Sequence, residues 1–212
     1  MEILEQISEN LQQGDDEQVF ALTRQAIAQH VPAGEILHQG LIAGMDVVGK
    51  RFRDYEIFLP DVLLAAKAMM AGMEELKPLL VRDGVPTVGK VVIGTVRGDL
   101  HEIGKNLVGI MLEGAGFEVI DLGKEVTPEQ FVTTAVDANA SVIGMSALLT
   151  TTMPVMKEVV DLVRERGLAG KVKTIVGGAP VSREFATEIG ADAYGYDAAN
   201  AVERVKGLSG GS

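Results

Sequence analysis

The sequence contains no cysteine and no tryptophan, and its other aromatic residues are limited to six Phe and three Tyr in 212 residues. The absence of cysteine excludes disulfides, thiolate metal sites and cysteine nucleophiles. The scarcity of aromatic side chains argues against a platform on which nucleic-acid bases stack. Thiol-dependent enzymes, thiolate zinc proteins and base-stacking proteins are therefore not expected.

Basic residues are also scarce, because 19 Lys and Arg stand against 30 Asp and Glu and give a formal net charge of −11. This sign is wrong for a protein that follows phosphate groups, so nucleic acid is not expected as a partner. Apolar runs stay below the ~18 residues that suggest a membrane span. The acidic, amphipathic segment MEILEQISEN does not resemble a signal peptide. We therefore expect a cytoplasmic protein with no membrane contact.

The spacing of apolar residues along the sequence changes near residue 84. From residue 1 to about residue 82, apolar side chains recur at helical spacing in four segments, with breaks at 13–15, 30–32 and 54–60. Pro60 suits the first turn of the last of these helices. The pattern predicts a small four-helix bundle in a first domain, residues 1–84.

The second predicted domain, residues 88–212, alternates short β-branched runs with helical segments. Strands are expected at 90–96, 118–122, 141–146, 173–176 and 193–196, and helices near 102–114, 128–138, 153–166, 182–189 and 198–206. Five strands joined by helical crossovers predict an α/β domain of flavodoxin-like or Rossmann-like type. Its parallel sheet would be covered by helices on both faces.

Ligands of such sheets bind beyond the carboxyl ends of the strands, where the direction of winding reverses. For a flavodoxin-like strand order this point lies between the first and third strands. The loops 97–101 and 147–152 should therefore meet there, beside Gly177 and Gly178 after the fourth strand. The polar side chains expected around this crevice are those of Asp99, His101, Ser146, Thr150 and Thr152.

The glycines near this crevice do not form a common nucleotide motif. The segment GTVRG, residues 94–98, is not G-x-G-x-x-G, and no G-x-x-x-x-G-K-[ST] occurs. A histidine with a carboxylate two residues away suits a metal ligand whose second nitrogen is held by an anion. The other histidines, His30 and His38, lie in the first half, so a freestanding zinc or iron site at His101 lacks further ligands. A metal bound there would bring its own equatorial ligands.

Three motifs occur in a fixed order: D-x-H-x-x-G at 99–104, S-x-L at 146–148, and the pair Gly177-Gly178. In these motifs the chain resembles the corrinoid methyl-transfer proteins and the cobalamin-binding domain of cobalamin-dependent methionine synthase. The resemblance includes the first half, where Phe52 and Leu59 in RFRDYEIFLPDVLLAAKAMM are similar to residues of the helical cap that shields the upper face of the corrin. The length and layout most resemble the stand-alone corrinoid proteins of one-carbon methyltransferase systems.

This resemblance implies cobalamin or a related corrinoid as the cofactor. His101 would replace the dimethylbenzimidazole base as the lower axial ligand of cobalt, Asp99 would hydrogen-bond its other nitrogen, and Thr152 would extend this relay in place of a serine. Proton uptake by the relay would weaken the bond between His101 and cobalt. The displaced nucleotide tail would enter the sheet. The implied cofactor-binding residues are Asp99, His101, Glu102, Ile103, Gly104, Ser146, Leu148, Thr150, Gly177, Gly178, Ala179, Phe52 and Leu59.

The resemblance further implies a methyl carrier that is not catalytic alone. Its partners would be a substrate-specific methyltransferase, an acceptor methyltransferase that uses a pterin or a thiol, and a reductive activating protein. Two alternatives remain open: a small subunit of a cobalamin-dependent mutase, which lacks such a cap, and a cobalamin-based sensor or regulator, which normally carries a DNA-binding segment. If no corrinoid binds, the second domain would be a flavodoxin-like module for another ligand.

Overall fold

The computed structural model describes residues 2–85 and 88–209, so the predicted domain ends at residues 1 and 212 lie outside the described residues. The chain divides into two compact units, residues 1–87 with 113–116 and residues 88–112 with 117–212. Each unit is described by itself below.

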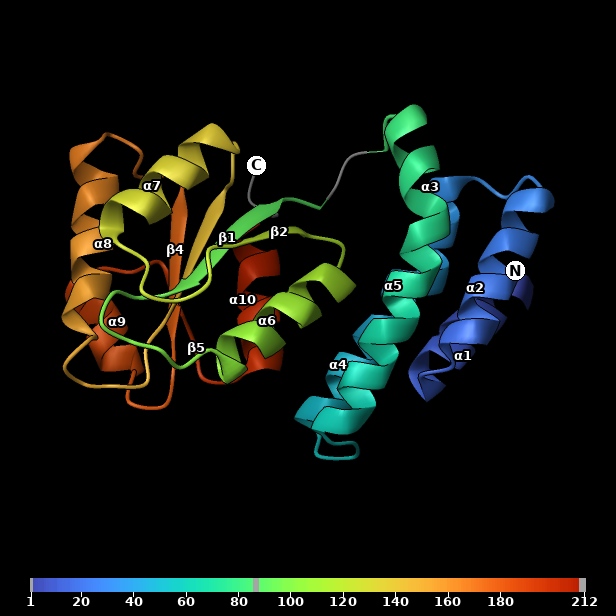
Figure 1. The fold of residues 1–212 in the computed structure, drawn as a ribbon, viewed down its shortest axis with the longest axis horizontal. Coiled ribbons are helices and arrows are strands. Elements are labelled where there is room, and N and C mark those ends of the chain that lie inside the picture. Colours follow the sequence, from blue (N-terminus) through green and yellow to red (C-terminus); the bar gives the residue numbers. More distant parts are fainter. Residues whose placement is uncertain (1, 86–87, 210–212) are drawn as a thin grey trace. The chain divides into compact units, whose positions relative to one another are not determined.

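The first unit is helical (Figure 1). Its elements are α1 (Glu2–Gln13), α2 (Asp16–Ala28), α3 (Ala33–Glu35), the π-helix η1 (Ile36–Ile42), α4 (Ala43–Arg53) and α5 (Leu59–Arg82). Because α3, η1 and α4 follow one another without a break, they form the third of four helices, and the predicted four-helix cap is confirmed. Pro60 lies in the first turn of α5, where the carboxylate of Asp61 accepts a hydrogen bond from the backbone N–H of Phe58 at 2.8 Å.

The π-helix was not predicted, because apolar spacing over 36–48 reads as a regular helix. Two glycines bring this part of the third helix close to α1. A Cβ atom on Gly40 would lie 3.1 Å from Cγ2 of Ile7, and one on Gly44 would lie 3.0 Å from the backbone oxygen of Ser8. The largest fully buried side chains of the unit are those of Ile7, Leu11, Val19, Ile36, Leu41, Val48, Val62 and Leu76.

The second unit contains a parallel sheet of five strands in the order β2-β1-β3-β4-β5. The strands are β1 (Lys90–Thr95), β2 (Glu118–Asp121), β3 (Val142–Ser146), β4 (Lys173–Gly177) and β5 (Ala193–Gly195). The helices are α6 (Ile103–Gly114), α7 (Pro128–Asp137), α8 (Pro154–Glu165), α9 (Arg183–Ile189) and α10 (Ala198–Ser209). The predicted α/β fold, with a helical cap followed by a five-stranded parallel sheet, is confirmed.

Strand ends differ from the predicted ones by a single residue. Val96 lies beyond β1 and forms an isolated bridge with Val126, while Ser141, Leu122 and Tyr196 fall outside their strands. Gly177, predicted as a turn residue, is the last residue of β4. Pairing determines these limits, because β2 and β5 each have one neighbour in the sheet and leave it after fewer residues than their apolar runs suggest.

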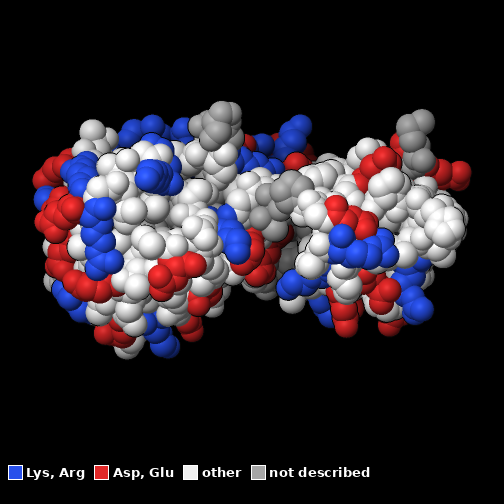
Figure 2. All heavy atoms as spheres, turned by 90° about the horizontal axis from the view of Figure 1, so that it is seen from above, with Lys and Arg blue, Asp and Glu red and all other residues white. Residues whose placement is uncertain are grey.

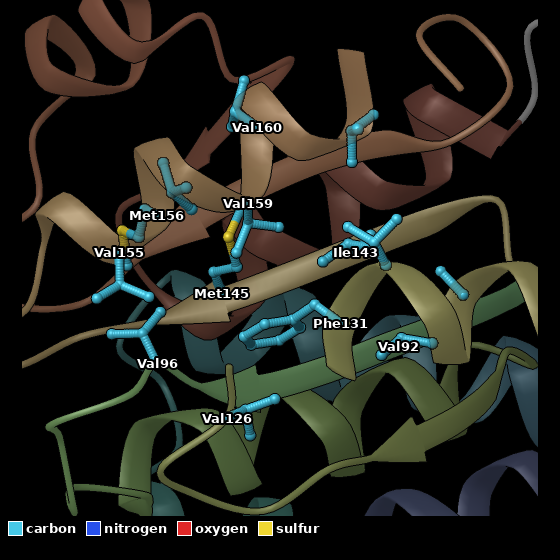
Figure 3. Close-up of a cluster of buried hydrophobic side chains, with 14 of the residues drawn as sticks. Val92, Val96, Val126, Phe131, Ile143, Met145, Val155, Met156, Val159 and Val160 are labelled. Carbon is cyan, nitrogen blue, oxygen red and sulfur yellow. The ribbon is translucent and has the colours of Figure 1, made fainter. Parts of the chain in front are cut away.

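Figure 1 shows α7, α8 and α9 on one side of the sheet and α6 and α10 on the other. The main hydrophobic cluster lies on the first side, and Figure 3 shows Phe131 of α7 among side chains of β1 and β3. Phe131 packs on Gly94, because a Cβ atom there would lie 2.8 Å from the ring. The helices on this side are therefore tightly packed, whereas the other side contains the cavity described below.

Acidic and basic side chains are interspersed over the face seen in Figure 2. Within residues 2–85 and 88–209, none of the helices combines the length and the apolar character needed to cross a bilayer.

Candidate functional site

A cavity of about 620 Å³ opens at the carboxyl ends of the strands in the second unit. It is bounded by residues of the three central strands and by α6 and α10. Its volume falls within the range of about 300–1,000 Å³ that is usual for small-molecule sites. The predicted site residues that line it are His101, Glu102, Ile103, Gly104, Ser146, Leu148, Gly177, Gly178 and Ala179.

Asp99 and His101 form a tight pair at the mouth of this cavity. Nδ1 of His101 lies 2.7 Å from Oδ1 of Asp99, and the backbone N–H of His101 donates to the same oxygen at 3.1 Å. The Asp99 side chain is fully buried, whereas the His101 side chain is 52% exposed. Since an ionised carboxylate can only accept, Nδ1 carries the proton of the neutral imidazole, and Nε2 of that tautomer has a free lone pair. Nε2 is therefore the nitrogen available to a metal.

The second oxygen of Asp99 joins this loop to the loop after β3. Oδ2 accepts hydrogen bonds from the backbone N–H groups of Leu148 at 2.7 Å and Leu149 at 3.1 Å, and from the hydroxyl of Thr152 at 2.9 Å. Burial would raise the pKa of Asp99, but the hydrogen bonds from His101, Leu148 and Thr152 outweigh it and hold that pKa well below its usual range. Asp99 is therefore an anion at neutral pH.

The Thr152 hydroxyl has one proton and two acceptors within reach, Oδ2 of Asp99 and the backbone oxygen of Leu149 at 2.8 Å. While Asp99 is ionised, the hydroxyl of Thr152 must donate its proton to Oδ2 of Asp99. Otherwise a lone pair of the hydroxyl oxygen would face a lone pair of the carboxylate. If Asp99 were protonated, the hydroxyl could donate to Leu149 instead. The geometry thus permits the predicted chain of hydrogen bonds from His101 through Asp99 to Thr152.

A further contact to His101 comes from Thr95, the last residue of β1. Its side chain is fully buried, and its hydroxyl donates to the backbone oxygen of His101 at 2.9 Å. The sequence analysis missed this residue, because a threonine in a strand carries no signal that separates it from its β-branched neighbours. Asp99 thus fixes the imidazole and Thr95 fixes the backbone of the same residue.

We expect Thr95→Val to lower the free energy of unfolding of the apoprotein by about 1–2 kcal/mol, because the His101 oxygen loses its donor while the volume stays the same. Thr95→Ser keeps the hydroxyl and should retain more of the hydrogen-bond energy. Urea denaturation followed by circular dichroism measures both. A valine variant as stable as the wild type would show that the hydrogen bond contributes nothing.

Some predicted site residues do not line the cavity. Thr150 is exposed in the loop after β3, and Thr152 is buried behind Asp99. Phe52 and Leu59 belong to the first unit, where Phe52 is half-buried in α4 and Leu59 begins α5 with 37% of its surface exposed.

The sequence analysis also missed one wall of the cavity. The loop after β5 and the helix α10 contribute Tyr196, Asp197, Ala198, Ala201 and Val205. A usable signal existed, because Tyr196 and Asp197 follow the fifth strand and the carboxyl ends of parallel strands share one edge. Asp197 also caps α10, accepting a hydrogen bond from the backbone N–H of Asn200 at 2.7 Å.

The surroundings of His101 suit a planar, largely apolar group that carries its own metal. Within the described residues, no group of three or more His, Asp or Glu side chains is arranged to hold a metal ion. Four large apolar side chains near His101 are exposed: Leu100, Ile103, Leu148 and Leu149. A Cβ atom on Gly104 would meet nothing within 4 Å, so the space beside Gly104, three residues after His101, is open. These features fit a corrinoid, with one protein nitrogen for cobalt and a cavity for the nucleotide tail.

Comparisons with known proteins agree with this geometry. Residues 89–205 match the family model described as a B12 binding domain, and residues 3–77 match a second model with the same description. The chain is 45% identical over 191 residues to dimethylamine corrinoid protein 1 of Methanosarcina acetivorans, covering 90% of this chain and 89% of that one. It is 42% identical over 207 residues to trimethylamine corrinoid protein 1 of Methanosarcina mazei, covering 97% and 96%.

Among solved structures, the chain resembles the methanol:cobalamin methyltransferase complex MtaBC of Methanosarcina barkeri. The TM-score is 0.87 at 30% sequence identity, and the match covers 100% of this chain and 81% of that chain. The predicted family and the predicted corrinoid cofactor are therefore confirmed, and this chain belongs to the family of corrinoid proteins with B12-binding domains.

Proposed function

We propose that this protein is the methyl carrier of a corrinoid-dependent methyltransferase system. It receives a methyl group from a substrate-specific methyltransferase and passes it to an acceptor methyltransferase that uses a pterin or a thiol. The observation that carries this proposal is the arrangement at His101, whose Nδ1 is held by a buried anion while its exposed ring leaves Nε2 available. Bound cobalamin supplies the cobalt that accepts and releases the methyl group.

In this proposal His101 is the protein ligand of cobalt through Nε2. Asp99 fixes the tautomer and the direction of the ring, because its Oδ1 accepts from both Nδ1 and the backbone N–H of His101. Thr152 holds the other oxygen of Asp99 and completes the hydrogen-bonded chain along which a proton could be stored. Protonation of this chain would weaken the proposed bond between Nε2 and cobalt, and its ionised form would favour that bond.

The small residues at the carboxyl ends of β3 and β4 form the entrance for the nucleotide tail. Gly178 has φ +126°, and a Cβ atom there would lie 1.9 Å from the backbone oxygen of Ala147, so only glycine lets these two loops meet. Gly177 and Ser146 lie side by side in the register of β4 and β3. In the same proposal Leu148, Thr150 and Ala179 are further contacts of the cofactor in this unit, while Phe52 and Leu59 contribute from the first unit.

The names of the relatives favour a methyl carrier over the alternatives. The two relatives above are named for dimethylamine and trimethylamine, and the solved complex is a methanol:cobalamin methyltransferase. The B12-binding match over residues 3–77 also supports a cap of the kind that mutase small subunits lack. We therefore propose a methylated amine or methanol as the source of the methyl group, and a reductive activating protein as a third partner.

A partner assay tests this function. The protein reconstituted with hydroxocobalamin and chemically reduced is mixed with methyltransferases specific for monomethylamine, dimethylamine, trimethylamine or methanol, each with its substrate. We expect one of them to change the visible spectrum of the corrinoid within turnover time, and the others to act at least about tenfold more slowly, because docking surfaces discriminate between partners. If every enzyme methylates its own corrinoid protein but none acts on this one, the proposed carrier role is wrong.

A further inference from the structure

The cavity continues down the sheet, well below His101. Register places Thr95, Ser146, Gly177 and Gly195 in one row across the sheet near its carboxyl edge. The next row on the same face holds Ile93, Gly144 and Ile175, and the cavity reaches Val91 one row deeper. Four residues of strand between Thr95 and Val91 correspond to a depth of about 13 Å. The span of α6 from Gly104 to Leu112 gives about 12 Å.

The polarity of the lining changes along this depth. All lining residues with polar side chains stand near the mouth, at the strand ends or in the first turns of the two helices: His101, Glu102, Lys105, Ser146, Tyr196 and Asp197. Below them the lining is apolar, and we call this part the deep chamber: Val91, Ile93, Leu112, Gly144, Ile175 and Val205. A polar group that enters the deep chamber therefore meets no polar side chain among the described residues.

Backbone groups do not replace the missing side chains. The strands that form the floor are β1, β3 and β4, and each of them pairs with a neighbour on both sides. Their N–H and C=O groups are used within the sheet, and those of α6 and α10 are used along the helices. The deep chamber thus offers an inserted ring dispersion contacts and no hydrogen bond.

Gly144 provides the room for such a ring. It lies between Ile93 and Ile175, and a Cβ atom on it would lie 3.2 Å from Cγ2 of Ile93 and 3.6 Å from Cγ2 of Ile175. The two isoleucine side chains flank a flat stretch of backbone. A planar aromatic base can lie on this stretch, with its edges against the isoleucines.

We propose that the deep chamber selects the lower base of the corrinoid, and that it prefers a benzimidazole such as 5,6-dimethylbenzimidazole to adenine. This inference rests on the proposed function, in which the nucleotide tail of the cofactor enters the cavity. The phosphate and ribose would stay beside the polar mouth, and the base would reach the chamber. Adenine brings an amino group and several ring nitrogens that are hydrogen-bonded in water and would be unpaired there, whereas the methyl groups of dimethylbenzimidazole fill apolar space.

The test is equilibrium dialysis of the apoprotein against three corrinoids, with bound corrinoid measured by its absorbance. Cobalamin carries dimethylbenzimidazole, adeninyl cobamide carries adenine, and cobinamide has no nucleotide tail. We expect adeninyl cobamide to bind about tenfold or more weakly than cobalamin, because a buried polar group without a partner is costly. Cobinamide should also bind more weakly than cobalamin, since it leaves the chamber unfilled.

Two variants locate the effect. Gly144→Ala should weaken the binding of cobalamin about tenfold, because its methyl group takes the place of the base. Cobinamide binding should not change, which also shows that the variant is folded. Val205→Thr adds a hydroxyl to the chamber without a change in volume and should reduce the preference for cobalamin over adeninyl cobamide. The matched control is Val202→Thr, a buried position of the same helix that does not line the cavity.

The outcomes separate this inference from the proposed function. Equal affinities for cobalamin and adeninyl cobamide, both reduced by Gly144→Ala, would overturn the selectivity while the tail still occupied the cavity. Equal affinities for cobalamin and cobinamide, unchanged in Gly144→Ala, would show that the tail lies elsewhere. The placement of the tail in the proposed function would then fail, and the selectivity with it.

Discussion

His101→Ala is expected to remove the axial nitrogen from cobalt entirely. In the wild type, reconstituted with cobalamin and reduced to the paramagnetic cobalt(II) state, electron paramagnetic resonance should show splitting by one nitrogen. The reason is the geometry of the ring: its Nδ1 is occupied by Asp99, and the half-exposed side chain lines the cavity, so Nε2 is the nitrogen left for a metal. Alanine has no atom that can replace it, so the splitting should disappear.

The nitrogen must be shown to belong to the protein, because the base of the cofactor also contains nitrogen. Labelling the wild type with ¹⁵N-histidine should change the splitting from a triplet to a doublet. The control is His38→Ala, an exposed histidine of the first unit, which should leave the spectrum unchanged. A triplet that persists in the ¹⁵N-labelled protein would refute ligation by His101. An unaltered signal in His101→Ala would refute it as well.

The strand order and the crevice could be predicted because both follow from rules about parallel sheets. Short β-branched runs separated by helical segments define the sheet, and the switch point between the first and third strands brings Asp99 to Thr152 across fifty-three residues. The short-range part, Asp99 and His101 two residues apart, is visible in the sequence itself. The hydrogen bonds that join Asp99 to Leu148, Leu149 and Thr152 required only that the loops 97–101 and 147–152 meet.

Other contacts of the site could not be predicted, because nothing in the sequence fixes the direction of the side chains involved. Thr95 donates to the backbone of His101, a contact that depends on where the loop turns back over β1. Thr150 lies in the correct loop but outside the cavity lining, since loop residues have no periodicity that assigns them to a side. The wall formed by α10 depends on which face of that helix packs on the sheet, and several faces of it are apolar or small.

We expect the largest loss of stability from a substitution of Asp99, whose carboxylate is fully buried. Its two oxygens accept hydrogen bonds from four residues: His101, Leu148, Leu149 and Thr152. Asparagine has one oxygen and one NH₂ group, so either the His101 donors or the donors of the loop after β3 would face a donor. We expect Asp99→Asn to lower the free energy of unfolding of the apoprotein by about 2–4 kcal/mol at pH 7.

The same substitution should disturb the tautomer of His101. If the asparagine NH₂ group faces the ring, Nδ1 must become the acceptor, and the proton moves to Nε2, the nitrogen proposed to bind cobalt. Axial nitrogen splitting should then weaken in Asp99→Asn even where the protein is folded. A variant with wild-type splitting and wild-type stability would show that Asp99 does not control the ring.

The dependence of this stability difference on pH has a definite sign. The folded protein holds the pKa of Asp99 below its usual range, so the stabilisation is fully present above the ordinary aspartate pKa of about 3.9. It is lost as the pH falls through that value toward the lower pKa of the folded state. Since asparagine does not titrate, the difference between wild type and Asp99→Asn should shrink as the pH falls below about 3.9. Urea unfolding of the apoproteins at several pH values measures it, with the exposed Asp137→Asn as control. A difference that stayed constant to about pH 2 would mean that the lost stability comes from packing rather than from the buried anion.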